Sequence, residues 1–343
     1  MSEGMQVLTA DVGGTYVRFA LAHSEAPGLL VDGSVQQLEV AAFSSLIEAG
    51  QQFLSIARVS PEQLGAGVLA VAGRVEGDFA QMTNHPWRIS ATETAAAFGL
   101  PVTKLVNDFT AQALAVEHLR GAHLQPIGHH WPRAEASESA TFDVLGPGTG
   151  LGVSAFLRRD GLSLALESEG GHSAFAPSNE HEAAVRDLLA TKFGRVSYER
   201  LLSGAGLANI EWALATLAGQ SRAMPLAPAA VTQGAREGNP TCCAALAMFC
   251  SVFGAFAGDL VLTLGAWDGV FLSGGLVPRL LNELQQGDFR RAFENKGRFS
   301  AAMASVPTLA VTHTHAGLDG AAAMALKLLP QELPATSRRL AAL

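Results

Sequence analysis

The chain has 343 residues, 48% of them apolar, so it is long enough for two domains and can bury a sizeable core. Its formal net charge of −8 argues against a nucleic-acid groove, because phosphate backbones need clustered Lys and Arg. Cys242, Cys243 and Cys250 lie in one apolar run without metal-ligand spacing, which predicts buried thiols in a reducing compartment. No basic segment followed by an apolar one opens the chain, so we expect a cytoplasmic protein without a signal peptide.

The first part of the chain alternates strands and helices. Continuous apolar runs indicate buried strands, and apolar residues at helical spacing indicate the helices between them. This order is typical of an α/β fold with a largely parallel sheet. The expected elements are strands at 5–10 and 17–21, a helix over 43–57, strands at 67–72 and 102–106, and a helix over 110–119.

A polar stretch over 129–140 predicts a surface loop near a domain boundary, after which the opening layout recurs. A strand at 141–145, a glycine-threonine turn and a strand at 151–157 repeat the order of the first hairpin, which indicates two domains of related topology. The later expected elements are a helix over 180–193 with Ser178 or Asn179 as its N-cap, a mostly helical segment over 240–264, strands at 269–272 and 306–312, and a helix over 317–328.

The apolar segment 249–267 raises the question of a membrane span. It contains Ser251, Asp259, Thr263 and three glycines, so we interpret it as a buried core helix that leads toward a strand. We therefore expect no contact with a membrane.

The first glycine turn carries an aspartate and a threonine. Gly13 and Gly14 can leave backbone N–H groups open to a phosphate, and Thr15 adds a hydroxyl donor. Asp11, at the end of the strand, can hold Mg²⁺, usually through water. An ordinary glycine-rich hairpin would have the same residues, so the motif alone leaves both interpretations open.

A second glycine turn, over 146–152, is denser. No Gly-Lys-[Ser/Thr] follows it, and its glycine spacing and the strand behind it disagree with a dinucleotide site. Gly148 and Thr149 suit a second phosphate-binding hairpin, and two such hairpins could hold the β- and γ-phosphates from both sides of a cleft. Gly274 and Gly275 end a buried strand, where a flat adenine or ribose can approach the backbone.

Several polar residues can bind a sugar. Asn107 and Asp108 follow a buried strand, at the end where ligands bind in α/β sheets, and a carboxylate there can accept the proton of a sugar hydroxyl. A helix N-cap accounts for Asp108 as well. Glu169 and His172 lie on a short glycine turn and Glu199 lies beside a helix start, where each can hydrogen-bond a sugar or serve as a solvated or capping residue.

Two histidine pairs raise a metal question. His129 with His130, and His313 with His315, lack Cys or carboxylate partners at ligand spacing, so we interpret both pairs as loop residues. The G-x-S-x-G elbow and the protein-kinase catalytic loop are absent from the sequence.

Taken in order, eight motifs resemble the bacterial glucokinase family, which shares the fold of sugar kinases, actin and Hsp70-type ATPases. The resemblance covers nearly the whole chain and implies an α/β, ribonuclease H-like fold of two domains with an interdomain cleft. It places the smaller domain at 1–118 plus 313–343 and the larger at 119–312. Because the zinc-binding cysteine cluster of the repressor-related sugar kinases is absent, the chain resembles the zinc-free group. The motifs lie at 11–15, 82–87, 107–111, 148–152, 169–172, 199–204, 274–279 and 297–299.

The resemblance implies roles for matching residues. Asp108 would be the general base on the 6-hydroxyl of glucose, and the nucleotide would be ATP with Mg²⁺ held by Asp11 through water. It also implies a glycolytic kinase that forms a homodimer. The sugar contacts would come from Asn107, Asp108, Thr149, Gly150, Glu169, His172 and Glu199. The nucleotide contacts would come from Asp11, Gly13, Gly14, Thr15, Gly148, Thr149, Gly274 and Gly275.

Three residues depart from the family pattern. Tyr16 replaces an Asn, Arg74 replaces a Pro, and Ala316 lies where the family has an Asn-Pro-Gly pattern. The first and third lie near the expected nucleotide side, so two alternatives stay open: a catalytically weak or inactive sugar-binding regulator, and a kinase for mannose, fructose or an amino sugar.

Overall fold

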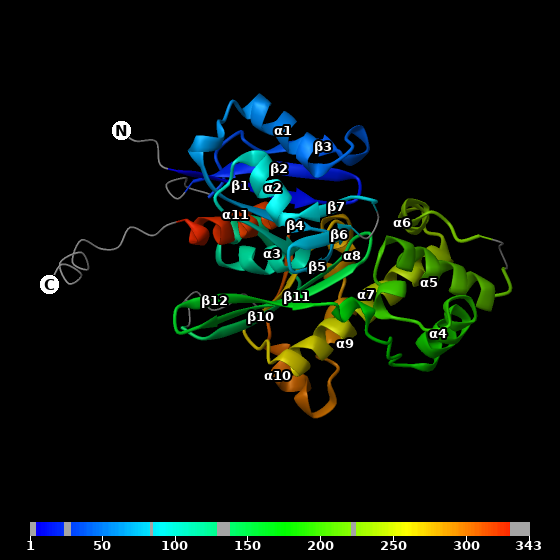
Figure 1. The fold of residues 1–343 in the computed structure, drawn as a ribbon. Helices are drawn as coiled ribbons and strands as arrows, with labels where there is room; N and C mark the ends of the chain where they lie inside the picture. The colour runs from blue at the N-terminus through cyan, green and yellow to red at the C-terminus, as the bar shows by residue number, and fades with distance from the viewer. Residues whose placement is uncertain (1–4, 24–28, 83–84, 129–137, 221–223, 330–343) are drawn as a thin grey trace. The chain divides into compact units, whose positions relative to one another are not determined.

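The structure is a computed structural model that describes residues 5–23, 29–82, 85–128, 138–220 and 224–329. The chain divides into two compact units, and each is described by itself. Unit 1 comprises Met1–Ala111 with Gly317–Leu343, and unit 2 comprises Gln112–Ala316. Both are built on a mixed sheet with helices (Figure 1).

Unit 1 contains a five-stranded sheet in the order β3-β2-β1-β4-β8. The first two strands form an antiparallel hairpin, whereas β1, β4 and β8 run parallel. A second sheet of three short strands has the order β5-β6-β7. The strands are β1 (Gln6–Val12), β2 (Tyr16–Ala22), β3 (Gln36–Glu39), β4 (Leu64–Val71), β5 (Gly73–Glu76), β6 (Phe79–Met82), β7 (Arg88–Ser90) and β8 (Thr103–Asn107).

Helices cover both faces of the five-stranded sheet, because its strands alternate their side chains between two cores. Leu8 and Leu69 lie in one apolar cluster with Phe53 of α1 (Leu46–Ala57) and with residues of α2 (Ala91–Phe98). Val7 and Val68 lie in the other, with three buried alanines of α11 (Ala316–Leu328). Between β8 and unit 2 the chain forms α3 (Asp108–Leu114), which crosses the boundary of the two units.

Unit 2 contains a six-stranded sheet in the order β12-β11-β10-β13-β14-β9. Its first three strands form an antiparallel meander, and β10, β13 and β14 are parallel. The strands are β9 (Leu124–Pro126), β10 (Ala140–Pro147), β11 (Leu151–Arg159), β12 (Leu162–Ser168), β13 (Gly269–Leu272) and β14 (Thr308–Val311). The helices are α4 (Glu180–Phe193), α5 (Gly204–Leu217), α6 (Pro228–Arg236), α7 (Pro240–Leu264), α8 (Leu281–Gln285), α9 (Asp288–Glu294) and α10 (Ser300–Ala304).

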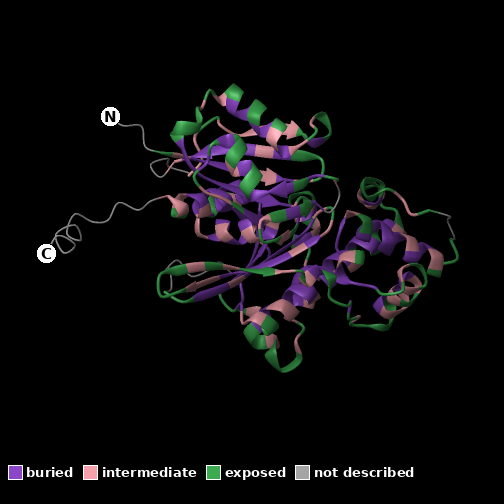
Figure 2. Ribbon diagram, viewed as in Figure 1, coloured by how far each residue is buried: buried purple, intermediate pink, exposed green. Residues whose placement is uncertain are grey.

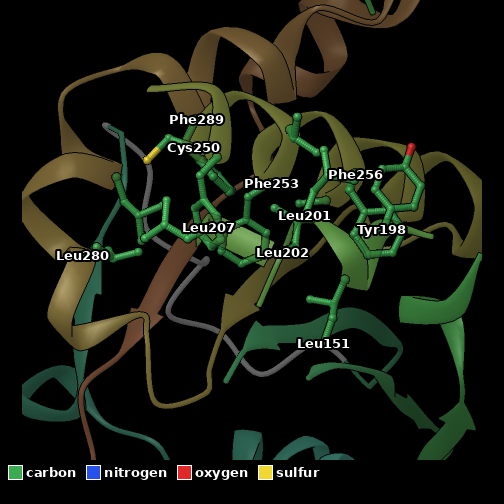
Figure 3. Packing of buried hydrophobic residues seen from close by; sticks show 14 of the residues in the cluster. Leu151, Tyr198, Leu201, Leu202, Leu207, Cys250, Phe253, Phe256, Leu280 and Phe289 are labelled. Carbon is green, nitrogen blue, oxygen red and sulfur yellow. The ribbon is translucent and has the colours of Figure 1, made fainter. Parts of the chain in front are cut away.

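The long helix α7 organises the core of unit 2. Phe256 stacks on Tyr198 with ring centroids 4.1 Å apart, and Phe253 meets the edge of Phe289 from α9 at 5.4 Å (Figure 3). A side chain at Gly254 would lie 2.0 Å from the carbonyl oxygen of Phe289, so α7 and α9 approach at backbone distance. Although α7 is long and apolar enough to cross a membrane, 61% of its most apolar window is buried in the protein, as in a core helix (Figure 2).

The structure corrects two expectations. The helix predicted over 110–119 begins earlier, at Asp108, and its α-helical part ends at Leu114, followed by a 3₁₀ turn over Ala115–Glu117. The thiols of Cys242 and Cys250 are buried, but that of Cys243 is exposed, so the prediction of buried thiols was wrong there. A helix start had been expected beside Glu199, but the bounds of α5 had not been predicted, and neither had α2, α6, α8, α9, α10 or the strands β3, β5, β6, β7, β9 and β12.

Candidate functional site

The candidate residues of unit 1 share one edge of its sheet. Val12 of β1 is in register with Val71 of β4, which is in register with Asn107 of β8. Because these three strands are parallel, Asp11 and Asn107 lie at the same carboxyl edge, two strand spacings or about 10 Å apart. Ligands bind at this edge in α/β sheets.

Asn107 and Asp108 form the start of α3. The side-chain oxygens Oδ1 of Asn107 and of Asp108 both accept from the backbone N–H of Phe109, at 2.9 and 3.0 Å. The amide Nδ2 of Asn107 donates to the carbonyl of Gly73 at 3.1 Å, which links the end of β8 to the first residue of β5. Both sequence interpretations of Asp108 therefore remain compatible with the geometry: it supports the first turn of a helix and stays half-buried at the sheet edge.

The first glycine turn is held through its backbone. Gly13 N–H donates to the carbonyl of Tyr16 at 2.9 Å, while Gly14 and Thr15 are exposed. Asp11 forms an ion pair with Arg18, directly across the hairpin, at 3.3 Å. A carboxylate at this edge of the sheet suits Mg²⁺, which binds proteins through one or two carboxylates, waters and substrate phosphates.

The second glycine turn is packed against β13 and α5. Its geometry leaves no room for a side chain at Gly146, where a Cβ would lie 1.7 Å from the carbonyl oxygen of Ser273. The carbonyl of Gly148 accepts from Gly204 N–H, the first residue of α5, at 2.9 Å. Thr149 and Gly275 are exposed. The amino end of a 14-residue helix and two glycine turns thus meet in unit 2, an arrangement that favours an anion.

Three candidate sugar residues lie together beside the same turn. The carboxylate oxygen Oε2 of Glu199 accepts from Leu151 N–H at 3.0 Å, and a Cβ at Gly150 would lie 2.5 Å from this oxygen. His172 lies 3.9 Å from Glu199 through Nδ1 and 3.9 Å from Glu169 through Nε2. The structure therefore brings Gly150, Glu169, His172 and Glu199 into one polar cluster. The hydrogen bond from Leu151 N–H to Glu199 connects this cluster to the second glycine turn.

Two contacts of these residues were missed by sequence reasoning. Arg18, which neutralises Asp11, could have been found by pairing the strands across the first turn, since the two residues are opposite in the hairpin. The hydroxyl of Ser273 donates to Gln112 Oε1 at 2.8 Å and links α3 to the end of β13, but these residues are 161 positions apart and no local pattern connects them.

The histidines form no recognised metal centre among the described residues. No group of three or more His, Cys, Asp or Glu side chains there has the geometry to hold a metal ion. The rings of His123 and His313 stack at 4.3 Å, and His315 meets the edge of His313 at 5.9 Å. The pair His129 and His130 lies outside the described residues, as do Thr83 and Asn84 of one family motif.

The three departures from the family pattern are accommodated without disturbing these turns. Tyr16 contributes its backbone carbonyl to the first turn, a contact that any residue supplies. Arg74 extends into solvent and pairs with Glu76 at 3.0 Å. Ala316 is buried as the first residue of α11, a position that an alanine fills well.

Comparison with solved structures gives the class of fold. The structure resembles the crystal structure of a glucokinase from an Antarctic psychrotroph, with a TM-score of 0.82 and 33% identity over 94% of this chain and 99% of that one. It also shares the fold of the glucokinase from Balamuthia mandrillaris solved in complex with glucose, at a TM-score of 0.75 and 22% identity over 94% of each chain. The protein therefore has the two-domain α/β fold of the sugar kinases, as predicted.

The sequence comparisons identify the family. The family model for glucokinase matches residues 8–328. Glucokinases from Xanthomonas euvesicatoria and Stenotrophomonas maltophilia are each 48% identical to this chain, over 93% of it and over 95% and 94% of their own lengths. The chain belongs to the glucokinase family, and the resemblance inferred from its eight motifs is confirmed.

Proposed function

We propose that this protein is a glucokinase, which transfers the γ-phosphoryl group of ATP to the 6-hydroxyl of glucose. Support comes from family membership over residues 8–328 and from relatives of that name at 48% identity. A glucokinase of the same fold has been solved with glucose and the ATP analogue AMPPNP, at a TM-score of 0.60.

The polar cluster beside the second glycine turn carries this proposal. Sugar hydroxyls need several fixed donors and acceptors, and Glu169 and Glu199 provide carboxylates that each lie 3.9 Å from the His172 ring. The Glu199 carboxylate accepts a hydrogen bond from Leu151 N–H. The residues suited to sugar hydroxyls are therefore connected directly to the glycine turn suited to a phosphate, and both belong to unit 2. Thr149 and Gly150 are further proposed sugar contacts in unit 2. Asn107 and Asp108 are the proposed sugar contacts in unit 1.

In the proposed reaction Asp108 is the general base. Its carboxylate takes the proton of the 6-hydroxyl as that oxygen forms a bond to the γ-phosphorus, and the bond from phosphorus to the bridging oxygen of ADP breaks. Asp11, Gly13, Gly14 and Thr15, together with Gly148, Gly274 and Gly275, are proposed to contact the nucleotide. Bound Mg²⁺, for which Asp11 is the proposed carboxylate, would neutralise phosphate charge.

Further proposals follow from the family. The enzyme acts in the cytoplasm, in glycolysis, and forms a homodimer. We also propose that the chain forms two functional domains, one of residues 1–118 with 313–343 and the other of residues 119–312.

Two substitutions at Asp108 separate its two interpretations. Asn is as good an N-cap as Asp but is no base, so Asp108→Asn should keep the melting temperature while kcat falls about 10²–10⁴-fold. Asp108→Ala should lower both. ADP release from Mg-ATP is measured with and without glucose, beside glucose binding by calorimetry. Near-normal kcat in Asp108→Asn would overturn the base assignment, and glucose binding without ADP release in the unsubstituted protein would favour the regulator.

A further inference from the structure

Ser273 is a buried hydroxyl residue at the end of an apolar strand. It follows Leu272, the last residue of β13, and is 4% exposed. Burying a hydroxyl costs stability unless the group is hydrogen-bonded. The Ser273 hydroxyl donates to Gln112 Oε1 at 2.8 Å, and Gln112 belongs to the last turn of α3, 161 positions earlier in the chain. Both residues lie in unit 2, so this contact is internal to one compact unit.

Backbone hydrogen bonds hold Ser273 in place. Its N–H donates to the carbonyl of Leu145 at 2.9 Å, and Leu276 N–H donates to the carbonyl of Pro147 at 3.1 Å. Between them, a Cβ at Gly274 would lie 2.7 Å from the Pro147 carbonyl oxygen, so the two backbones are in close contact. The Ser273 hydroxyl is therefore attached to backbone that is tied to the second glycine turn.

Gln112 connects this hydroxyl to the helix that begins at Asp108. Four residues separate Gln112 from Asp108, so the two lie on the same side of α3, about 6 Å apart along its axis. The start of the helix has an anchor of its own, the hydrogen bond from Asn107 Nδ2 to the Gly73 carbonyl. Because one hydrogen-bonded turn joins Asp108 to Gln112, a displacement of Gln112 would also displace Asp108.

We propose that Ser273 and Gln112 are positioning residues for the phosphoryl transfer: their hydrogen bond holds α3 to the backbone that continues into Gly274 and Gly275, and so sets the place of the Asp108 carboxylate. Neither residue touches a substrate in this proposal. The inference rests on the proposed function, in which Asp108 is the base and the two glycines contact the nucleotide. A general base must lie within hydrogen-bond reach of its proton, and a misplacement of about 1 Å costs up to about 100-fold in rate.

Substitutions that remove either partner of the hydrogen bond test this role. Ser273→Ala removes the donor, and Gln112→Met removes the acceptor while keeping a long side chain suited to a helix. Each should lower kcat about 10-fold at about 25 °C with the KM for glucose within about twofold, and the double variant should lose no more than either single one. Gln112→Glu should keep kcat within about threefold of the unsubstituted protein, because its carboxylate accepts from the same hydroxyl.

Ser154 provides a matched control for the loss of a buried hydroxyl. It is buried in β11, and its Oγ donates to the carbonyl of Leu166 at 2.9 Å. Ser154→Ala and Ser273→Ala should both lower the melting temperature by about 2–4 °C, but only Ser273→Ala should lower kcat. The proposal is overturned if Ser273→Ala and Gln112→Met keep full kcat, or if Gln112→Glu loses as much kcat as Gln112→Met.

Hydrogen exchange measures the anchor of α3 without turnover. The amides of residues 109–114 should exchange about 5–10-fold faster in Ser273→Ala than in Ser154→Ala, and equal rates in the two variants would contradict the proposal. Glucose-dependent ADP release by the unsubstituted protein tests the proposed function separately. Its absence would overturn the reaction and the positioning role together, whereas normal release by every variant would overturn the positioning role alone.

Discussion

Among the carboxyl groups of the described residues, Asp143 has a pKa that is controlled by its burial. It lies in the middle of β10 with Ala155 and Val270 as its cross-strand neighbours, is 0% exposed, and neither of its oxygens has a hydrogen-bond partner. Desolvation raises the pKa of Asp143 to about 8 from 3.8. We therefore expect folding to take up a proton at this residue at neutral pH.

The difference between the folded and unfolded pKa of Asp143 makes the free energy of unfolding depend on pH. A carboxyl group whose pKa is higher in the folded state stabilises the fold fully below the unfolded value of 3.8 and loses that contribution as pH rises toward about 8. Each pH unit in this window lowers the free energy of unfolding by about 1.4 kcal/mol. Between pH 5 and pH 7 the contribution of Asp143 should thus fall by about 3 kcal/mol, a large part of the stability of a domain.

Asp143→Asn removes this titration while keeping the shape of the side chain. Neutral Asn and protonated Asp leave similar unpaired groups in the core, so their stabilities should be close at low pH, and the variant should gain about 3 kcal/mol on the parent between pH 5 and pH 7. Urea unfolding of a parent and variant that both carry Trp87→Phe, followed by tryptophan fluorescence, measures this difference in unit 2. Asp160→Asn, at the exposed turn between β11 and β12, is the control. Parallel pH profiles of parent and Asp143→Asn would refute the reasoning.

Two further predictions concern the glycine turn and the core helix. Gly150→Ala should raise the KM for glucose about 10–100-fold with little loss of stability, because its Cβ would displace the Glu199 carboxylate and not the backbone. Unchanged steady-state kinetics would contradict the assignment of Glu199. Asn239→Ala should lower the melting temperature by about 2–4 °C through the loss of about 1 kcal/mol, because Asn239 Oδ1 accepts from Thr241 N–H and Cys242 N–H at the start of α7. An unchanged calorimetric transition would argue against this cap.

Elements with local stop signals were predictable from the sequence. The helix expected over 180–193 is α4 over Glu180–Phe193, and Asn179 is its cap, since its side chain accepts from Glu182 N–H at 2.9 Å. Gly194, with φ of +68°, ends it at the residue where a side chain would be strained. Likewise the strands around both glycine turns were found, because apolar runs end there at glycine.

What escaped sequence reasoning depends on contacts across the fold. The alternating leucines of β12 show that one face of a strand is apolar, but the pattern alone does not tell whether that face is covered by the same chain. Asp143 interrupts an apolar run, and only the assembled fold, in which this side chain is 0% exposed and neither oxygen has a hydrogen-bond partner, shows that it is buried without one. Local patterns encode periodicity, whereas burial and partners are properties of the assembled sheet.

The link between Glu199 and the second glycine turn also constrains how the proposed site can change its substrate. Oε2 of Glu199 already accepts from Leu151 N–H, which leaves Oε1, 3.9 Å from His172, as the less engaged acceptor for a sugar hydroxyl. A Cβ at Gly146 would lie 1.7 Å from the carbonyl oxygen of Ser273, so the backbone of the turn is held close to the end of β13, and Leu151 N–H of this turn orients the carboxylate. A change of sugar preference is therefore more readily made at Glu169 and His172, whose exposed side chains have no such anchor to the turn, than at Glu199.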